Sequence, residues 1–366
     1  MSLYIGLMSG TSMDGVDAVL CRIEGQKLTT LSQVALPFPA PLLNTLHQLC
    51  APGENELFLA GQADREIAHL YSGAVKTLLK QNNLEPADIT ALGSHGQTVR
   101  HHPDTTPPFT LQLGDPNTLA AATGIAVVAD FRRKDIALDG QGAPLVPAFH
   151  QFQFGAQQPA IVVNIGGIAN LSVLRHEQPP LGFDTGPGNT LMDQWVQHHK
   201  GVTYDADGQW AASGNVNEPL LKALLDDSYF RQPAPKSTGR EYFNLSWLDS
   251  VLADLPVPVK AVDVQATLCA LTARSIGQAV AGFNDVQNVY VCGGGAFNQQ
   301  LMQMLSAQVA PLPVDTTTAL GIHPQWVEGA AFAWLAHANI MRIQGNVPGV
   351  TGASRAAVLG GLFLPD

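Results

Sequence analysis

The sequence lacks the two commonest nucleotide-binding signatures. No G-x-x-x-x-G-K-[ST] occurs, which excludes a P-loop enzyme, and no G-x-G-x-x-G occurs, which argues against a Rossmann dinucleotide site. Basic residues are also scarce, with 19 Lys and Arg among 366 residues and a formal net charge of −11. Such a surface disfavours nucleic acids and anionic membranes as partners. An anionic ligand must then be held by backbone amides, a few placed cations and a metal ion.

Cysteine is rare as well, with four residues and no C-x-x-C pair. Cys21, Cys269 and Cys292 lie in apolar runs, so we expect small core side chains in a reducing compartment. No signal-peptide pattern is found near the N-terminus. Residues 140–174 carry no charge, but their Pro, Gln and Asn residues argue against a membrane span. We therefore expect a soluble, cytoplasmic protein.

The length exceeds what one hydrophobic core usually fills, so two domains are expected. Strands and helices alternate along the chain, which is typical of an α/β fold. The Gly/Pro-rich segment 139–147 is the expected crossing. It separates an N-terminal lobe, 1–138, from a C-terminal lobe, 139–342. The tail 343–366 either follows the second lobe or packs back on the first. Strands are expected at 3–8, 16–23, 89–93, 109–113, 125–129 and 289–292, a hairpin at 160–174, and helices at 54–82, 264–283 and after 116, 189, 298 and 324.

Two stretches about half a chain apart share one pattern. Residues 3–20 and 160–174 each predict an apolar strand, a tight turn of small residues and a returning strand. Small residues let backbone N–H groups approach an anion, and hydroxyls add donors. The pair therefore predicts a cleft that grips a polyphosphate from both sides, although each turn alone is also typical of an ordinary hairpin.

The segment Phe183–Asn189 has the most suggestive chemistry. Asp184 follows an apolar pair at a strand end, and a Gly/Pro loop then leads into a helix. A carboxylate in that place can face a cleft as a general base, or it can cap a turn. The glycines 293–295 follow a buried strand and suit either a flat ligand or a tight strand-to-helix connection. The polar segment Lys236–Glu241 either closes over the site or is a plain linker.

Further polar residues end strands in the first half of the chain. Ser94–Thr98 and Arg132 fit the strand ends that line ligand crevices in open α/β sheets, or else surface turns. Glu328 lies in the first turn of a helix, where a carboxylate is favourable without any function. The pairs His101–His102 and His198–His199 have no ligand at metal spacing, so we expect no metal site there.

These segments in order resemble one family. Two strand-hairpin phosphate loops and a glycine-rich strand end are the arrangement of the hexokinase, Hsp70 and actin superfamily. The detailed sequence of these segments resembles that of the anhydro-N-acetylmuramic acid kinases over nearly the whole chain, without departure at the key positions. The resemblance implies a two-domain actin-like ATPase (ribonuclease H-like) α/β fold with a central cleft. The matching segments are Gly6–Gly15, Gly93–Thr98, Gly140–His150, Asn164–Gly167, Gly182–Asn189, Lys236–Glu241, Val291–Asn298 and Trp326–Leu335.

The resemblance implies a bacterial transferase of peptidoglycan (murein) recycling that uses ATP and Mg²⁺. Such an enzyme hydrolyses the internal bond of 1,6-anhydro-N-acetylmuramic acid and phosphorylates O6, giving N-acetylmuramate 6-phosphate and ADP. Asp184 would deprotonate the water that attacks the anomeric carbon, as in an inverting glycosidase, and O6 would attack the γ-phosphate directly. The family also implies a homodimer. An ordinary sugar or amino-sugar kinase, or a non-enzymatic ATP-binding switch, remains an alternative.

The resemblance and the motifs together assign the expected site. Asp184 is the catalytic residue, and Asp14 holds Mg²⁺ through water. The expected ATP-binding residues are Gly10, Thr11, Ser12, Met13, Asp14, Gly15, Val16, Asp17, Asn164, Gly166, Gly167, Gly186, Gly188, Asn189, Gly293, Gly294, Gly295 and Asn298. The expected sugar-binding residues are Ser94, His95, Gln97, Thr98, Arg132 and Glu328.

Overall fold

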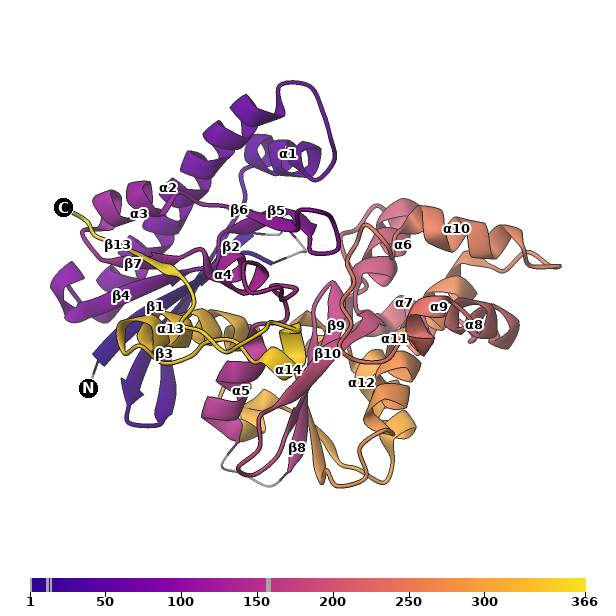
Figure 1. Ribbon diagram of the computed structural model, residues 1–366. Coiled ribbons are helices and arrows are strands. Elements are labelled where there is room, and N and C mark those ends of the chain that lie inside the picture. Colours follow the sequence, from indigo (N-terminus) through magenta and orange to yellow (C-terminus); the bar gives the residue numbers. More distant parts are fainter. Residues whose placement is uncertain (1, 11–12, 14, 156–158) are drawn as a thin grey trace. The chain divides into compact units, whose positions relative to one another are not determined.

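The structure is a computed structural model that describes residues 2–10, 13, 15–155 and 159–366. Tertiary contacts divide the chain into two compact units (Figure 1). Unit 1 comprises 1–153 and 326–366, and unit 2 comprises 154–325. Each unit has its own hydrophobic core, as expected for a chain of this length.

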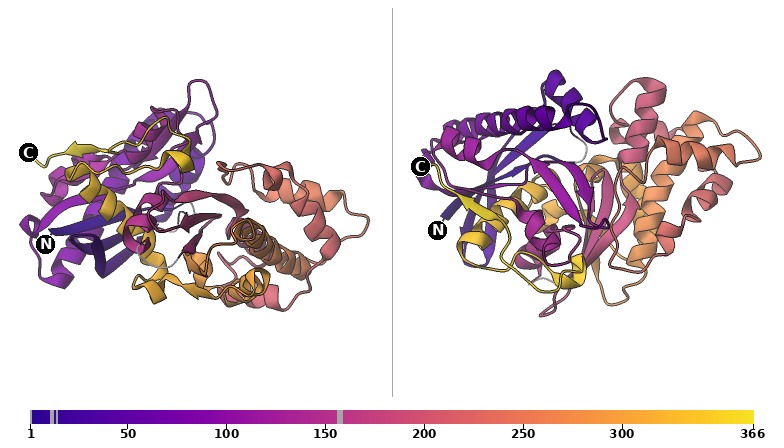
Figure 2. Two further views of the ribbon diagram at one scale, coloured as in Figure 1. Left: turned by 60° about the horizontal axis from the view of Figure 1, so that its bottom comes forward. Right: turned by 45° about the horizontal axis from the view of Figure 1, so that its top comes forward.

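Unit 1 is built on a sheet that has six strands among the described residues, in the order β13-β7-β4-β1-β2-β3. Strands β1 to β3 form an antiparallel meander, and β4 and β7 continue the sheet in parallel with β1. Helices α1, α2 and α3 pack on one face of this sheet, and α13 packs on the other (Figures 1 and 2). The strands are β1 (Ser2–Met8), β2 (Gly15–Glu24), β3 (Lys27–Pro37), β4 (Ile89–Ser94), β7 (Val127–Ala129) and β13 (Gly361–Phe363), with a separate hairpin of β5 (Gln97–His102) and β6 (Phe109–Leu113). The helices are α1 (Ala40–Leu49), α2 (Glu56–Asn82), α3 (Pro116–Thr123), α4 (Phe131–Ile136), α5 (Val146–Phe154), α13 (Val327–Ile340) and α14 (Pro348–Thr351).

Glycines let α13 approach the sheet of unit 1 closely. A Cβ on Gly6 would lie 1.7 Å from the carbonyl oxygen of Gly329, and one on Gly93 would lie 1.9 Å from that of Phe332. A side chain at either position would therefore push the helix away from β1 and β4. This close packing is why α13 belongs to unit 1.

The ends of the units differ from the boundaries expected at 138/139 and 342/343. Helix α5 remains with unit 1 because Gln153 exchanges two hydrogen bonds of 3.0 Å with the backbone of Leu28 in β3. Phe149 of the same helix also contacts Trp334 of α13, with ring centroids 6.3 Å apart. After α13 the tail continues across unit 1, where β13 pairs with β7.

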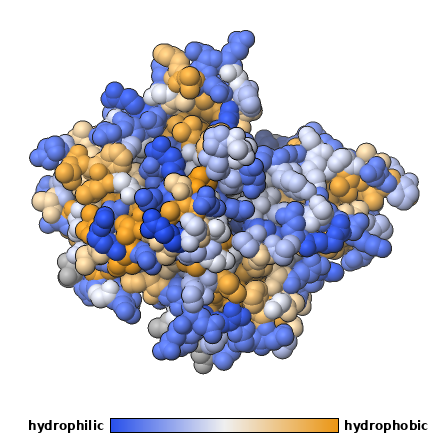
Figure 3. All heavy atoms as spheres, viewed as in Figure 1, coloured by the Kyte–Doolittle hydropathy of each residue, from blue (hydrophilic) through white to orange (hydrophobic). Residues whose placement is uncertain are grey.

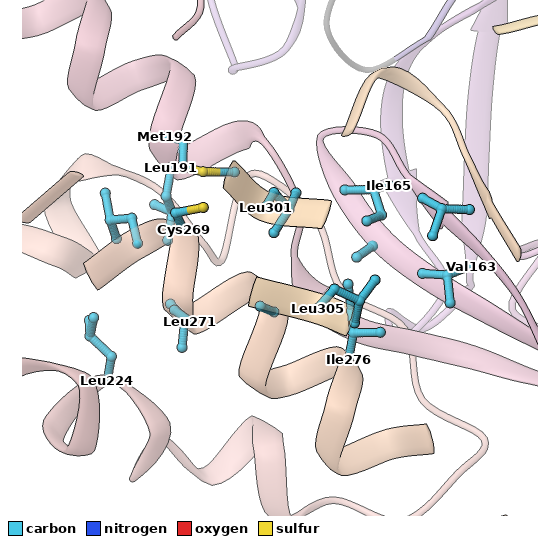
Figure 4. Packing of buried hydrophobic residues seen from close by; sticks show 14 of the residues in the cluster. Val163, Ile165, Leu191, Met192, Leu224, Cys269, Leu271, Ile276, Leu301 and Leu305 are labelled. Atoms are coloured by element: carbon cyan, nitrogen blue, oxygen red, sulfur yellow. The ribbon is translucent and has the colours of Figure 1, made fainter. Parts of the chain in front are cut away.

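Unit 2 has a sheet of five strands within its described part, in the order β10-β9-β8-β11-β12. Strands β8 to β10 form an antiparallel meander, and β11 and β12 run parallel to β8. Apolar side chains of β8, such as Val163 and Ile165, pack with residues of α6, α11 and α12 in one core (Figure 4). The strands are β8 (Ala160–Ile165), β9 (Ile168–Leu174), β10 (Leu181–Pro187), β11 (Asn288–Cys292) and β12 (Val314–Thr316). The helices are α6 (Thr190–Lys200), α7 (Gln209–Ala212), α8 (Glu218–Leu225), α9 (Ser228–Arg231), α10 (Leu245–Ala253), α11 (Ala261–Val280) and α12 (Gln299–Val309).

The two sheets repeat one topology. If the strands of the main sheet are counted along the chain within each unit, both sheets have the order 3-2-1-4-5, and unit 1 adds β13 beside its fifth strand. The predicted two-domain α/β fold of the actin-like class is therefore confirmed. Among the described helices none is long and apolar enough to cross a membrane. The face in Figure 3 is mostly hydrophilic with some apolar groups. The side chains of Cys21, Cys269 and Cys292 are buried, as expected.

Candidate functional site

Asp184 lies at a β-bulge in β10. The register of β10 against β9 shifts between Asp184 and Gly186, so Thr185 is an extra residue in the strand. The Thr185 hydroxyl donates to the Ala169 carbonyl at 3.2 Å and anchors the bulge. Gly186 has φ 146°, and a Cβ there would lie 2.7 Å from the ring of Phe230. A bulge of this kind redirects the neighbouring side chain, and such bulges are common beside active sites.

Asp184 is 7% exposed and is held by hydrogen bonds to neighbouring residues. Its N–H donates to the Lys236 carbonyl at 3.1 Å, and the N–H of Thr238 donates to its Oδ2 at 3.0 Å. The Tyr229 hydroxyl donates to the Asp184 carbonyl at 2.7 Å. Burial, and to a smaller extent the Asp184 charge, raise the pKa of Tyr229, so this hydroxyl stays a protonated donor. The carboxylate is thus oriented by its surroundings before any ligand arrives.

The segment 236–241 contacts the site through its first residues. Besides its backbone bond to Asp184, Lys236 donates from Nζ to the Tyr229 carbonyl at 3.1 Å and lies 4.5 Å from the centre of the Tyr229 ring. Burial lowers the pKa of Lys236, and the nearby Asp184 carboxylate opposes that shift. The sequence left this segment open as a lid or a linker. It gave no sign of Tyr229, whose role depends on tertiary packing.

Two glycine turns meet at the end of β8. The N–H groups of Gly188 and Thr190 donate to the Gly167 carbonyl at 2.9 and 3.1 Å, and the N–H of Asn189 donates to the Gly166 carbonyl at 2.8 Å. A Cβ on Gly188 would lie 2.3 Å from the Gly166 carbonyl oxygen. Backbone hydrogen bonds therefore join residues 166–167 to residues 188–189, although the two turns are separate in the sequence.

The glycines after β11 join the same edge. Gly293 has φ 80°, and a Cβ there would lie 2.5 Å from Oδ1 of Asn164, which ends β8. Gly294 is exposed, and its Cβ would lie at an ordinary 3.5 Å from Nδ2 of Asn189. Strands β8 and β11 are parallel, so their carboxyl ends open at one edge of the sheet, where α/β proteins bind ligands. The structure therefore brings together Asn164, Gly166, Gly167, Gly188, Asn189 and Gly293 to Gly295.

Asn298 has a structural task beside this edge. Its Oδ1 accepts a hydrogen bond of 3.0 Å from the N–H of Leu301 and so caps the N-terminus of α12. The same oxygen would lie 2.2 Å from a Cβ on Gly208, which explains the glycine there.

The first predicted phosphate loop is described in part. Thr11, Ser12 and Asp14 lie outside the described residues. The Gly10 carbonyl accepts from the N–H of Met13 at 3.3 Å, and the Met13 side chain is buried in the core of unit 1.

The other end of this loop leads into β2. Val16 is also a core residue, and a Cβ on Gly15 would lie 2.2 Å from the Leu36 carbonyl oxygen in β3. These two residues therefore shape the hairpin itself. Asp17 accepts a hydrogen bond of 2.8 Å from Gln33, also in β3.

Arg132 and His95 form the centre of a polar cluster in unit 1. Arg132 donates from Nε to His95 Nε2 at 2.9 Å and from Nη1 to the Gly142 carbonyl at 2.7 Å. His95 Nδ1 lies 2.7 Å from the Gly96 carbonyl. Burial and then the Arg132 charge hold the pKa of His95 well below its usual range. The imidazole is therefore neutral, with Nδ1 donating and Nε2 accepting.

The other predicted sugar-binding residues surround this pair. The Ser9 hydroxyl donates to Oε1 of Gln97, and Gln112 donates to the Thr98 hydroxyl at 3.2 Å. The buried Ser94 hydroxyl has no hydrogen-bond partner within the described part of the chain.

Glu328 lies in the first turn of α13. It is half-buried and lies one turn before Phe332, whose ring centre is 4.7 Å from that of His95.

A sequence model of one family, described as anhydro-N-acetylmuramic acid kinase, matches residues 2–365. The chain belongs to the anhydro-N-acetylmuramic acid kinase family. A relative of that name from Shewanella sp. (strain MR-4) is 52% identical over 362 residues, 98% of both chains, and one from Shewanella sediminis is 52% identical over 365 residues, 99% of both chains. Among solved structures, the (R)-2-hydroxyglutaryl-CoA dehydratase component A of Acidaminococcus fermentans aligns with a TM-score of 0.48 and 10% identity, over 91% of this chain and 96% of that one.

This member of the kinase family has a further histidine in the cluster that the sequence did not assign to it. His101 Nδ1 lies 3.0 Å from the Thr110 hydroxyl, while its Nε2 is buried without a partner among the described residues. Burial, with a smaller effect of Arg132, lowers the pKa of His101 to about 4. The sequence raised only a metal-ligand role for His101, and that role was not expected. No group of three potential metal ligands occurs in the described ranges, and His199 packs on Trp195 with ring centres 4.1 Å apart.

Proposed function

We propose that this protein is an ATP-dependent kinase of peptidoglycan recycling. It hydrolyses the 1,6-anhydro bond of 1,6-anhydro-N-acetylmuramic acid and phosphorylates O6, releasing N-acetylmuramate 6-phosphate and ADP. The observation that carries the proposal is family membership over residues 2–365, and the oriented carboxylate of Asp184 supports it.

Asp184 is proposed as the general base. Its Oδ2 is oriented by the N–H of Thr238, and the carboxylate would take a proton from the water that attacks the anomeric carbon. As the anhydro bond breaks, the electron pair goes to O6, which attacks the γ-phosphorus while ADP leaves. Because the phosphoryl group takes up the charge on O6, a second carboxylic acid that protonates the leaving oxygen is not required.

ATP is proposed to bind along the glycine edge of unit 2. Asn164, Gly166, Gly167, Gly188, Asn189 and Gly293 to Gly295 present peptide groups with few side chains in the way. Such an edge suits the close approach of a nucleotide to the backbone. The hairpin residues 10–17 of unit 1 are proposed to supply the second set of donors, as the family resemblance implies.

Mg²⁺ is proposed to accompany the nucleotide. It keeps several waters and is usually held by phosphate oxygens and one or two carboxylates, so an all-protein cage is not needed. Asp14 is the proposed contact through water. When bound, the ion neutralises charge on the phosphates.

The sugar is proposed to bind at the polar cluster of unit 1. Arg132 offers a cation for an anionic substituent, such as the lactyl carboxylate of this amino sugar. Neutral imidazoles, amides and hydroxyls suit the uncharged hydroxyl and acetamido groups. The proposed residues are Ser94, His95, Gln97, Thr98, Arg132 and Glu328.

A substrate panel tests this function. Purified protein is incubated with ATP, Mg²⁺ and, in separate reactions, the anhydro sugar, N-acetylmuramate, N-acetylglucosamine and no sugar. We expect ADP in a one-to-one ratio with a 6-phosphorylated sugar only in the anhydro reaction. Turnover of the open sugars alone would instead indicate an ordinary amino-sugar kinase, and sugar-independent ATP hydrolysis would indicate an ATPase switch. Light scattering in the same buffer tests the proposed homodimer.

A further inference from the structure

A buried carboxylate lies next to the polar cluster of unit 1 without belonging to any predicted site. Asp135 of α4 is 0% exposed. Its Oδ2 accepts a hydrogen bond of 2.8 Å from the N–H of Gly142. A Cβ on Gly140 would lie 2.3 Å from the same oxygen, so the loop passes directly over the carboxylate. The Asp135 carbonyl also accepts from the N–H of Gly140 at 2.9 Å.

The other oxygen of Asp135 is bound by the C-terminal segment. Its Oδ1 accepts from Nδ2 of Asn346 at 2.7 Å and from the Thr351 hydroxyl at 2.8 Å. Asn346 in turn accepts from the N–H of Ala357 at 2.7 Å through its Oδ1. The hydrogen-bond partners of the Asp135 carboxylate are thus neutral groups. A buried acceptor of this kind is costly to leave unsatisfied.

One residue connects this network to the site. Gly142 donates its N–H to Asp135 and accepts from Arg132 Nη1 at 2.7 Å through its carbonyl. Gly142 is therefore bound to Asp135 through its N–H and to the guanidinium of Arg132 through its carbonyl. Arg132 reaches His95 from this position.

We propose that Asp135 is a positioning residue that fixes the Arg132 guanidinium through Gly142, and that Asn346 and Thr351 of the C-terminal segment set its own position. This inference rests on the proposed function in so far as Arg132 binds the sugar. The structural part, from Asp135 to Arg132, stands apart from any substrate.

The test is Asp135→Asn. An amide has one acceptor and one donor end, so in either orientation its NH₂ faces Gly142 N–H or the two donors of the C-terminal segment. We expect the KM for the anhydro sugar to rise about tenfold, because small displacements of a positioning group have large effects. The KM for ATP should stay within about twofold. Thr351→Val, which removes one donor with little change of shape, should give the same split at smaller size and serves if Asp135→Asn does not fold.

Asp205 of unit 2 provides a matched control. It is also buried, and it accepts from one donor on Oδ1, the N–H of Trp210, and from two on Oδ2, the N–H of Ala211 and Nε2 of Gln265. Asp205→Asn should therefore disturb a similar network without changing the KM for the sugar. Equal KM changes in both variants would overturn the proposal, because a general loss of stability would then explain them.

A readout without substrate separates this inference from the proposed function. In protein labelled with ¹⁵N-arginine, the Nε–H signal of Arg132 is assigned by its loss in Arg132→Lys. We expect that signal to shift or broaden in Asp135→Asn and Thr351→Val and to stay in place in Asp205→Asn. An unchanged Arg132 signal in Asp135→Asn would overturn the inference. A wild-type protein without sugar-dependent turnover would overturn the proposed function and leave this result valid.

Discussion

The two units share a strand order but differ in the groups that they present at the carboxyl ends of their parallel strands. In unit 2 the edge beyond β8 and β11 is made of glycine turns whose peptides bond to one another. In unit 1 the corresponding end of β4 leads into His95, Gln97 and Thr98, and Arg132 donates a hydrogen bond to His95. The same topology therefore presents backbone groups beyond β8 and β11 in unit 2 and polar side chains beyond β4 in unit 1.

This difference fits the two kinds of ligand in the proposed function. Backbone N–H groups in glycine turns suit phosphate oxygens, which carry charge and tolerate any neighbouring side chain. A set of Arg, His, Gln and Thr side chains suits the distinct hydroxyl, amide and carboxylate groups of a sugar. In the proposed function, ligand choice depends on the groups at the strand ends and not on the fold itself.

The largest effect is expected from Asp184→Asn. The amide oxygen still accepts from Thr238 N–H, so fold and ATP affinity should stay unchanged, whereas kcat should fall about a thousandfold because the base is lost. Steady-state kinetics and calorimetric ATP binding measure the two properties. Asp226→Asn, at an exposed ion pair with Arg231, is the control and should behave like wild type. Wild-type turnover by Asp184→Asn would contradict the assignment.

Arg132→Lys tests the side-chain site of unit 1. Lysine cannot bond His95 and the Gly142 carbonyl with a planar fork, so the KM for the sugar should rise about tenfold to a hundredfold with little change in the KM for ATP. The neighbouring Arg133, which pairs with Asp130 at 2.6 Å on the surface, offers the same substitution as a control. A weaker ATP interaction in Arg132→Lys would show that the two sites are not divided as described.

Gly294→Ala tests the backbone site of unit 2. Its Cβ would make only an ordinary contact of 3.5 Å, so the melting temperature should stay close to that of wild type. A ligand that lies against the Gly294 backbone would meet the new methyl group, and the KM for ATP should rise about tenfold. Gly349→Ala, with no atom within 4 Å of its Cβ, controls for the change of residue type. Unchanged ATP affinity would remove Gly294 from the proposed edge.

The last prediction concerns acid stability, which we expect to be lower in unit 1 than in unit 2. In unit 1 burial lowers the pKa of His95, of His101 to about 4 and of His150 to about 3. The unfolded chain protonates these side chains near pH 6.5, so the folded state loses stability as the pH falls below that value, at up to about 1.4 kcal/mol per pH unit for each histidine. Above pH 7.5 they have no effect.

Hydrogen exchange at pH 7.5 and 5.5 measures this difference. Amides of unit 1 should lose protection before those of unit 2, and His101→Gln should reduce the loss. His176→Gln, at an exposed position of unit 2, is the control. Earlier opening of unit 2 would contradict the prediction.

The sequence predicted the strands and helices that carry strong periodic patterns. The predicted strand 109–113 coincides with β6, the hairpin at 160–174 is confirmed as β8 and β9, and the helix expected after 189 is α6. Strand β3 was missed because its alternation is weak, although the pair Gly25–Gln26 before it is typical of a two-residue hairpin turn.

The site was predictable only where short motifs carry the chemistry. The glycine turns and Asp184 stand out in the sequence, and the structure shows hydrogen bonds between the two turns. Tyr229 and Asp135 make contacts with residues far away in the chain, and no local sequence pattern predicts such pairs. His101 contacts Thr110 across the β5–β6 hairpin, and the sequence did not predict β5. The motif that contains Met13 and Val16 predicts a ligand loop, but the side chains of both residues lie in the core of unit 1. Only their backbone groups are then available to a ligand.

The most direct test is a crystal structure with a non-hydrolysable ATP analogue, Mg²⁺ and the anhydro sugar bound together. The account predicts a nucleotide against Gly166, Gly167 and Gly294, and an Asp184 carboxylate oxygen about 2.6–3.2 Å from a water on the far side of the anomeric carbon from O6. A nucleotide bound elsewhere, or an Asp184 that contacts neither that water nor the sugar, would contradict it.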